Sequence, residues 1–147
     1  MNTTAALTTA DVTRLMTEVA TALAEYDHLP RIDRVAVYGS GMTYLSLPYS
    51  IESGSTQRLI DELTRLCAWA AAFNTTVTIT LSYGGSGDAA VQVDLAGHPA
   101  RLLVSLHSGQ AYELGAALRR PVSSDQPTLT VAPADLLAAF TRSNGHG

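Results

Sequence analysis

The chain contains no lysine. All nine of its cationic side chains are arginines, against thirteen Asp and Glu, which leaves a formal net charge of −4. Without lysine, a P-loop, a Schiff-base mechanism and a Ser-Lys dyad are excluded. The only adjacent cations are Arg119 and Arg120, and an acidic chain with so small a basic cluster lacks the charge pattern of a nucleic-acid-binding protein. We therefore expect no nucleic-acid partner. The missing lysine, with many Ala and Thr, is typical of GC-rich coding and favours a bacterial source.

Cysteine is almost as scarce. The single residue, Cys67, excludes an internal disulfide and a Cys-built zinc site. It falls within an apolar helical pattern, which predicts a buried and inert thiol. The first ten residues have neither the positive region nor the apolar core of a signal peptide, and no apolar run approaches the ~20 residues that a membrane span needs. We expect a cytoplasmic protein that makes no membrane contact.

Charged residues make up 15% of the 147 residues and aromatic residues 6%, whereas hydrophobic residues make up 46%. This composition is globular, and the length fits one domain. We predict a single domain over residues 1–147, with a flexible lead at 1–8, an internal linker at 121–127 and a flexible tail at 143–147.

Hydrophobic periodicity predicts helices over about 10–27, 56–73 and 110–119, and a last helix that opens at Pro133. Alternating residues predict a hairpin over 34–38 and 43–47, a meander over 76–82, 89–95 and 101–107, and a further short strand over 128–131. The order α-β-β-α-β-β-β-α, with a short terminal β-α, favours an α+β fold. We expect a two-layer sandwich with a five-stranded, mainly antiparallel sheet in the order 2-1-3-4-5 and with helices on one face.

Pleat parity sorts the strand residues into an inner apolar face and an outward face, because successive side chains alternate. The expected pairs include Val93 with Leu102, Leu81 with Ala89, and Val37 with Leu45. The outward face then pairs Tyr38 with Tyr44, Asp94 with Arg101, and Asp88 with His107. This outward face is polar and rich in short side chains, and it consists of Tyr38, Tyr44, Ser46, Thr76, Thr78, Thr80, Ser82, Asp88, Gln92, Asp94, Arg101, Leu103, Ser105 and His107.

One row of the outward face resembles a catalytic triad in composition: Ser82, Asp88 and His107. In a working triad the histidine stands between the serine and the acid, whereas here the aspartate does. Ser82 and His107 would lie two strands, about 10 Å, apart, beyond the reach of a nucleophile and its base. Asp88 and His107 remain either an acid/base pair or a surface hydrogen bond at a strand end. No two histidines have metal-ligand spacing, and we expect neither a metal nor a cofactor.

The leading hypothesis is a non-catalytic interaction or accessory domain that acts as a homodimer or with another protein partner. Its contact residues would include Tyr38 and Tyr44, because interfaces are enriched in tyrosine and depleted in charge. The alternative is a small-ligand binder or modest enzyme with a pocket at the edge between helices and sheet, lined by Tyr83, Asp88 and His107.

Overall fold

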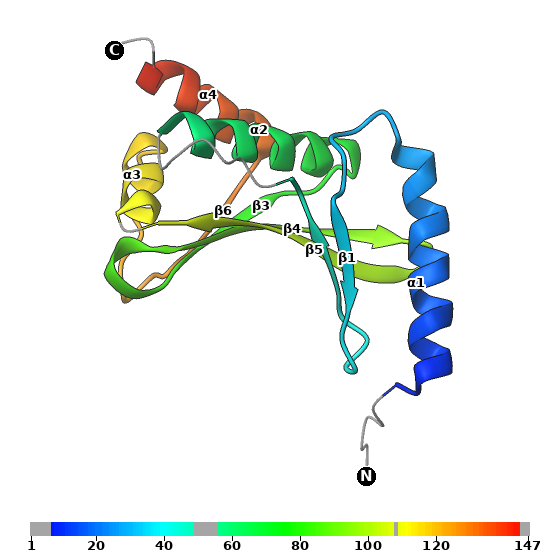
Figure 1. Ribbon diagram of the computed structural model, residues 1–147. Coiled ribbons are helices and arrows are strands. Elements are labelled where there is room, and N and C mark those ends of the chain that lie inside the picture. The colour runs from blue at the N-terminus through cyan, green and yellow to red at the C-terminus, as the bar shows by residue number, and fades with distance from the viewer. Residues whose placement is uncertain (1–6, 49–55, 108, 145–147) are drawn as a thin grey trace.

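The structure is a computed structural model that describes residues 7–48, 56–107 and 109–144, with residues 56, 83 and 140–144 described by their backbone alone. It is an α+β fold of two layers, as the sequence predicts (Figure 1). Most of the predicted lead and tail lies outside the described residues. The elements are α1 (Thr9–Leu23), the short 3₁₀ helix η1 (Ala24–Tyr26), β1 (Arg34–Val37), β2 (Thr43–Ser46), α2 (Thr56–Ala72), β3 (Val77–Leu81), η2 (Tyr83–Gly85), β4 (Gly87–Leu95), β5 (His98–Leu106), α3 (Gln110–Ala117), β6 (Thr128–Val131) and α4 (Pro133–Asn144).

The sheet has six strands in the order β1-β2-β5-β4-β3-β6, so the predicted five strands in the order 2-1-3-4-5 are wrong. β2 pairs with β5 in parallel rather than β1 with β3, and β6 adds an antiparallel strand beside β3. The hydrophobic pattern fixes which face of a strand is buried but not which neighbour covers its edge. β2 and β3 run parallel, because β2 is parallel to β5 and both the β5–β4 and the β4–β3 pairs are antiparallel.

Each predicted hairpin register is displaced by two residues. Val93 pairs with Ala100 instead of Leu102, because the β4–β5 turn is the two-residue Ala96-Gly97, with φ of 54° and 83°. Positive φ at both positions is the signature of the type I′ turn, which connects strands tightly. The predicted pairs Asp94–Arg101 and Asp88–His107 are therefore wrong. The strand partners in the structure are Asp94↔Pro99, Gln92↔Arg101 and Asp88↔Ser105.

The same displacement occurs in the other two hairpins. Val37 lies opposite Thr43 rather than Leu45, and Ile79 rather than Leu81 lies opposite Ala89. In the second case β4 begins at Gly87, where a Cβ atom would lie 1.8 Å from the Thr80 carbonyl oxygen. Only glycine allows this close pairing, and it sets the register.

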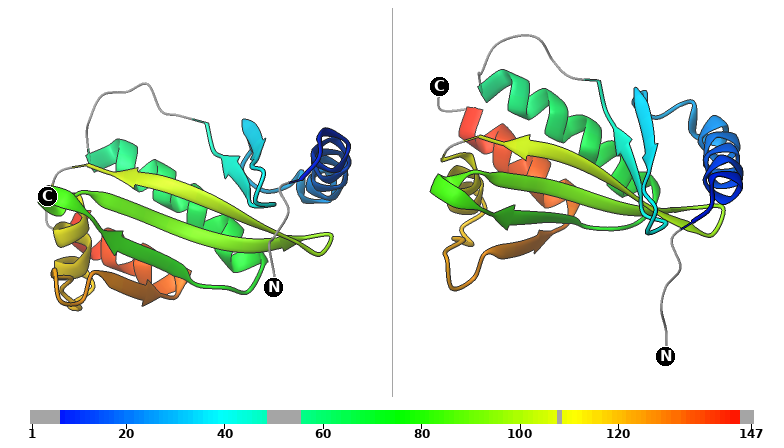
Figure 2. Two further views of the ribbon diagram at one scale, coloured as in Figure 1. Left: turned by 90° about the horizontal axis from the view of Figure 1, so that it is seen from below. Right: turned by 60° about the horizontal axis from the view of Figure 1, so that its bottom comes forward.

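A two-residue displacement leaves pleat parity unchanged, and the predicted division into two faces is confirmed. Val91 and Val104 are buried on the inner face. Helices α2 and α4 lie over this face (Figures 1 and 2). Helix α1 lies apart from these two, beside β1, where Val19 is buried. His98, in the β4–β5 turn region, contacts Glu18 of α1 with 2.5 Å between Nε2 and Oε2.

Within the described ranges, no helix is both long and apolar enough to cross a membrane.

The outer face is defined here as the side of the sheet turned away from α2 and α4. Seen from below, no helix among the described residues lies over it (Figure 2, left). Its residues follow from parity and register and are Arg34, Ala36, Tyr44, Ser46, Thr78, Thr80, Asp88, Ala90, Gln92, Asp94, Pro99, Arg101, Leu103, Ser105, Thr128 and Thr130.

Candidate functional site

Two tyrosines meet at one side of the outer face. Tyr44 projects from β2, and Tyr38 follows β1, where its backbone N–H donates to the Met42 carbonyl at 3.0 Å. The rings meet edge to face, with centroids 5.2 Å apart and planes at 89°, a geometry favoured by the ring quadrupoles. The strand partner of Tyr44 is Ala36, so Tyr38 reaches Tyr44 diagonally. The predicted contact is present although the predicted register is not.

The rest of the outer face carries charges of both signs, from Arg34, Asp88, Asp94 and Arg101, and an exposed leucine lies near its centre. Leu103 is 38% exposed, and Tyr38 is 56% exposed beside it on the hairpin. Toward the opposite sheet edge, Thr78 pairs with Thr130 and Thr80 with Thr128. Four threonines thus form a block of short, β-branched side chains, which lose little entropy when they are covered.

Asp88 lies on the outer face between Thr80 of β3 and Ser105 of β5. Partial burial raises the pKa of its carboxyl group, and the charge of Arg101 opposes that rise. Within the described part of the chain, the carboxylate has neither a hydrogen bond nor an ion pair. A half-buried, unpartnered acid on an open sheet face has capacity for an external donor.

His107 follows directly after β5, and its backbone N–H donates to Gln110 Oε1 at 2.6 Å. No hydrogen bond or ion pair joins it to Asp88 among the described residues. Tyr83 belongs to η2 by its backbone, and its side chain lies outside the described residues. Asp88 and His107 are therefore not bonded to each other, and the role of Tyr83, Asp88 and His107 as a pocket lining stays a prediction.

An edge cleft of about 540 Å³ opens where β2 diverges from β5. Its outer wall contains Tyr38, Tyr44, Leu103 and Ser105, and its floor is formed by Leu45 and Leu47 with Glu62 of α2. Asp33, Arg34 and Ser46 complete the lining. The volume falls within the roughly 300–1,000 Å³ of typical ligand sites.

Glu62 at the floor forms a buried ion pair with Arg58, one turn earlier on α2. Burial raises the pKa of the Glu62 carboxyl group, and the charges of Arg58, Arg65 and His107 oppose the rise. Sequence reasoning missed this pair, because an acid near a helix start is ordinarily explained by the helix dipole. The available signal was the i,i+4 spacing of Arg58 and Glu62 beside Leu59 and Leu63 of the apolar stripe.

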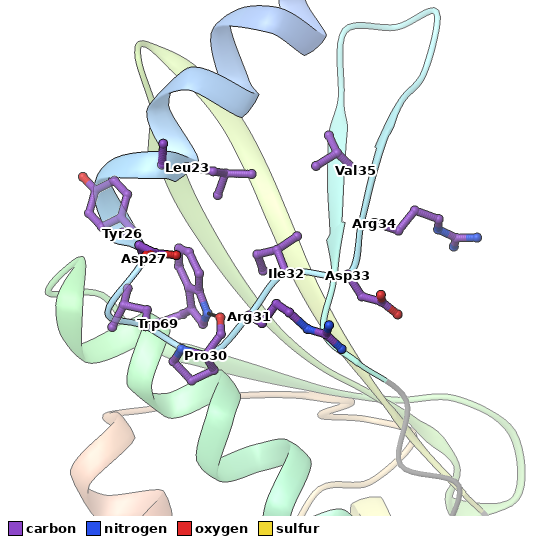
Figure 3. A pocket seen from close by; sticks show the side chains of 12 residues that line it. Leu23, Tyr26, Asp27, Pro30, Arg31, Ile32, Asp33, Arg34, Val35 and Trp69 are labelled. Carbon is purple, nitrogen blue, oxygen red and sulfur yellow. Dashed lines mark hydrogen bonds between the residues drawn. The ribbon is translucent and has the colours of Figure 1, made fainter.

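A second pocket, of about 430 Å³, lies between the end of α1, the loop leading to β1, and α2 (Figure 3). Trp69 closes one side, and its indole N–H donates to the Pro30 carbonyl at 2.9 Å. Leu23, Ile32 and Val35 supply apolar walls. The Trp69 side chain is only 1% exposed and belongs to the core.

Within the described residues, no three His, Cys, Asp or Glu side chains are grouped so that they could hold a metal ion. Comparisons with protein-family models, with curated proteins and with solved structures give no match for this chain.

Proposed function

We propose that the chain is a non-catalytic protein-association domain whose partner is a second copy of itself, joined across the outer face of the sheet. The observation that supports this most directly is the outer face, over which no described helix lies, with the tyrosine pair at one side, Leu103 near the centre and the threonine block at the other side. Exposed aromatic and apolar groups mark association surfaces.

The charges on the outer face are self-complementary. Arg101 on β5 is accompanied by Asp88 and Asp94 on β4, so two copies related by a two-fold axis would bring an arginine toward an acid of the other copy. Such pairs orient the partners more than they stabilise the complex. Asp88 fits this role because it has no partner among the described residues.

The size of the outer face sets the strength of the association. β4 and β5 have nine residues each, which corresponds to about 30 Å. Six strands spaced about 4.8 Å apart span about 24 Å, so the flat area is at most about 700 Å². A standard interface buries about 800 Å² per partner. The proposal therefore specifies a reversible dimer rather than an obligate one.

The test substitutes Leu103→Glu and measures mass by sedimentation equilibrium. We expect the variant to stay monomeric where the wild type associates, because an interfacial carboxylate loses its water without gaining a partner. The matched control is Met16→Glu on α1. Met16 is 41% exposed, a fraction similar to the 38% of Leu103, but it does not lie on the outer face. Association that is equal in the Leu103 and Met16 variants would refute the outer face as the interface.

The proposal includes a reducing, cytoplasmic setting. Its support is the single cysteine, which leaves the chain without an internal disulfide.

A second candidate function is small-ligand binding, and the specific observation in its favour is the Trp69 pocket rather than the predicted Tyr83, Asp88 and His107 lining. A metabolite screen by thermal shift tests it, because a ligand that binds only the folded state raises the melting temperature. Trp69 is the only tryptophan, so a true hit changes its fluorescence. His107→Ala distinguishes the two locations: it leaves binding in the Trp69 pocket intact.

A further inference from the structure

One strand of the sheet has an edge that its neighbour covers only in part. β2 pairs with β5 from Thr43↔Ala100 to Leu45↔Leu102, whereas β5 continues to Leu106. Beyond Leu102, β4 is the only described strand paired with β5. The edge cleft opens along this segment, with Leu103 and Ser105 in its lining.

The backbone groups that face the edge cleft follow from the alternation of an antiparallel pair. Leu95 and His98 flank the two-residue turn and therefore exchange hydrogen bonds. Every second residue of β5 from His98 bonds to β4, and the residues between them point their N–H and C=O the other way. Pro99 occupies such a position, which requires no N–H toward β4.

By the same alternation, Ser105 directs both its N–H and its C=O into the edge cleft. No turn or loop hydrogen bond to either group is found among the described residues, and the pairing of β2 with β5 ends before Ser105. The next position of this parity, His107, is already occupied, because its N–H donates to Gln110 Oε1. Among the described residues, the open edge is therefore short and centred on Ser105.

We propose that the edge cleft binds an extended peptide segment of a partner protein, which adds to β5 as a strand opposite Ser105. A peptide backbone carries a donor and an acceptor on the same side of each alternate residue, as a strand edge requires. This inference goes beyond the proposed dimer: the peptide extends the sheet within its plane, whereas a second copy stacks on its face.

The walls of the edge cleft define the chemistry of the peptide. Alternate side chains of an added strand point to opposite sides of the sheet. Those on the inner side meet Leu45 and Leu47, which favours apolar residues. Those on the outer side meet the ring of Tyr44 and the side chain of Leu103, which favour aromatic or branched residues. The bound segment is therefore β-prone and mainly apolar, with one hydrogen-bond donor on the inner side for Glu62 at the floor, and it lacks proline at the position opposite Ser105.

Amide hydrogen exchange, followed by NMR, tests the open edge in the protein alone. The Ser105 amide should exchange faster than the amides of Val104 and Leu106, which donate to β4. Slow exchange at Ser105 would mean that the edge is already covered and would overturn the proposal.

Peptide binding is tested with random peptides displayed on phage and selected on the wild-type protein. We expect the selected peptides to slow the exchange of the Ser105 amide. Ser105→Pro removes the N–H that faces the cleft without touching the β4 ladder, and it should weaken binding by about tenfold or more. Ser105→Ala keeps the N–H and should bind more tightly than Ser105→Pro does.

The matched control is Thr128→Pro at the opposite edge of the sheet. The Pro127 carbonyl accepts from Leu81 of β3, and the Thr130 carbonyl accepts from Arg120 at 2.8 Å. Thr128 therefore also points away from the sheet, and its proline variant should bind peptides as the wild type does. Equal binding by the Ser105 and Thr128 proline variants, or a selection that yields no binders, would overturn the proposal.

Sedimentation of the same variants separates this proposal from the dimer. If Ser105→Pro abolishes association of two copies, the edge pairs with a second copy and the peptide proposal is wrong. If Ser105→Pro loses peptide binding while association persists, the peptide site is supported. The dimer is then judged by Leu103→Glu alone.

Discussion

At the scale of single residues, the interior is apolar except for three residues, and the buried Thr43 hydroxyl has no hydrogen-bond partner among the described residues. Thr43, Arg58 and Glu62 are the buried polar residues of the described chain. Two of them form the ion pair on α2, and such buried pairs are costly to break from one side, because a charge is then left buried alone.

Cys67 provides a first prediction at this scale. The thiol is 1% exposed, and burial raises its pKa to about 12. Because the thiolate is the reactive form, the folded protein should not react with a thiol-specific reagent at neutral pH, and reaction should require unfolding. Labelling followed by mass spectrometry checks this, with urea-unfolded protein as the positive control. Rapid labelling of folded protein would contradict the buried position of Cys67.

Asp88 provides a second prediction, on pH dependence. Its folded-state pKa is raised from the ordinary 3.8, so the folded state binds the proton more tightly than the unfolded chain does. Stability therefore falls as the pH rises through the window between the two values, and the loss is complete above it. Asp88→Asn should be more stable than the wild type at neutral pH, by less than about 1 kcal/mol.

The measurement for Asp88 is urea unfolding as a function of pH, at a concentration where the chain is monomeric. The gain of Asp88→Asn should vanish below the ordinary pKa of an aspartate. Asp94→Asn is the control, because the same strand carries it at an exposed position. If the wild type instead gained stability relative to Asp88→Asn between acidic and neutral pH, the raised pKa of Asp88 would be contradicted.

The candidate site was only partly predictable from individual residues. Parity correctly placed Tyr38, Tyr44 and Leu103 on the outward side, because the alternation of apolar residues is visible in the sequence. The edge cleft was not predictable, since it depends on where β2 leaves β5, and pairing of those two strands involves residues more than 50 positions apart.

At the scale of elements, the β4–β5 turn determines the register of the longest hairpin. Ala96 adopts φ of 54°, a left-handed conformation that costs an L-residue other than Asn, Asp or Gly roughly 1–2 kcal/mol. The sequence has only the glycine of the preferred Asn-Gly signature. The pattern therefore does not predict the tight turn, and the predicted register is displaced.

The turn leads to a third prediction. Ala96→Asn should raise the free energy of unfolding by about 0.5–1 kcal/mol, because asparagine tolerates the left-handed region. Ala96→Val should lower it, since a branched side chain does not. Denaturant unfolding of both variants measures the difference. Equal stability of the two variants would show that the residue is not held at positive φ.

At the scale of the whole molecule, the layer architecture was predictable and the strand order was not. Helices with apolar stripes and strands with one apolar face specify a two-layer fold. The order in which strands meet depends on pairing between residues far apart in the sequence. Hydrophobic pattern alone did not distinguish the predicted β1–β3 neighbours from the β2–β5 neighbours of the structure. The consequence is functional, because the parallel β2–β5 pair creates the edge cleft and places the tyrosines beside Leu103.

The association of two copies across the outer face is the central claim, and the mass of the wild-type protein as a function of concentration tests it most directly. Sedimentation equilibrium should give the chain mass of 15.5 kDa at the lowest concentrations. We predict a rise toward twice that mass as the concentration increases through the micromolar range. A mass that stays at 15.5 kDa at every concentration up to the millimolar range would contradict the account.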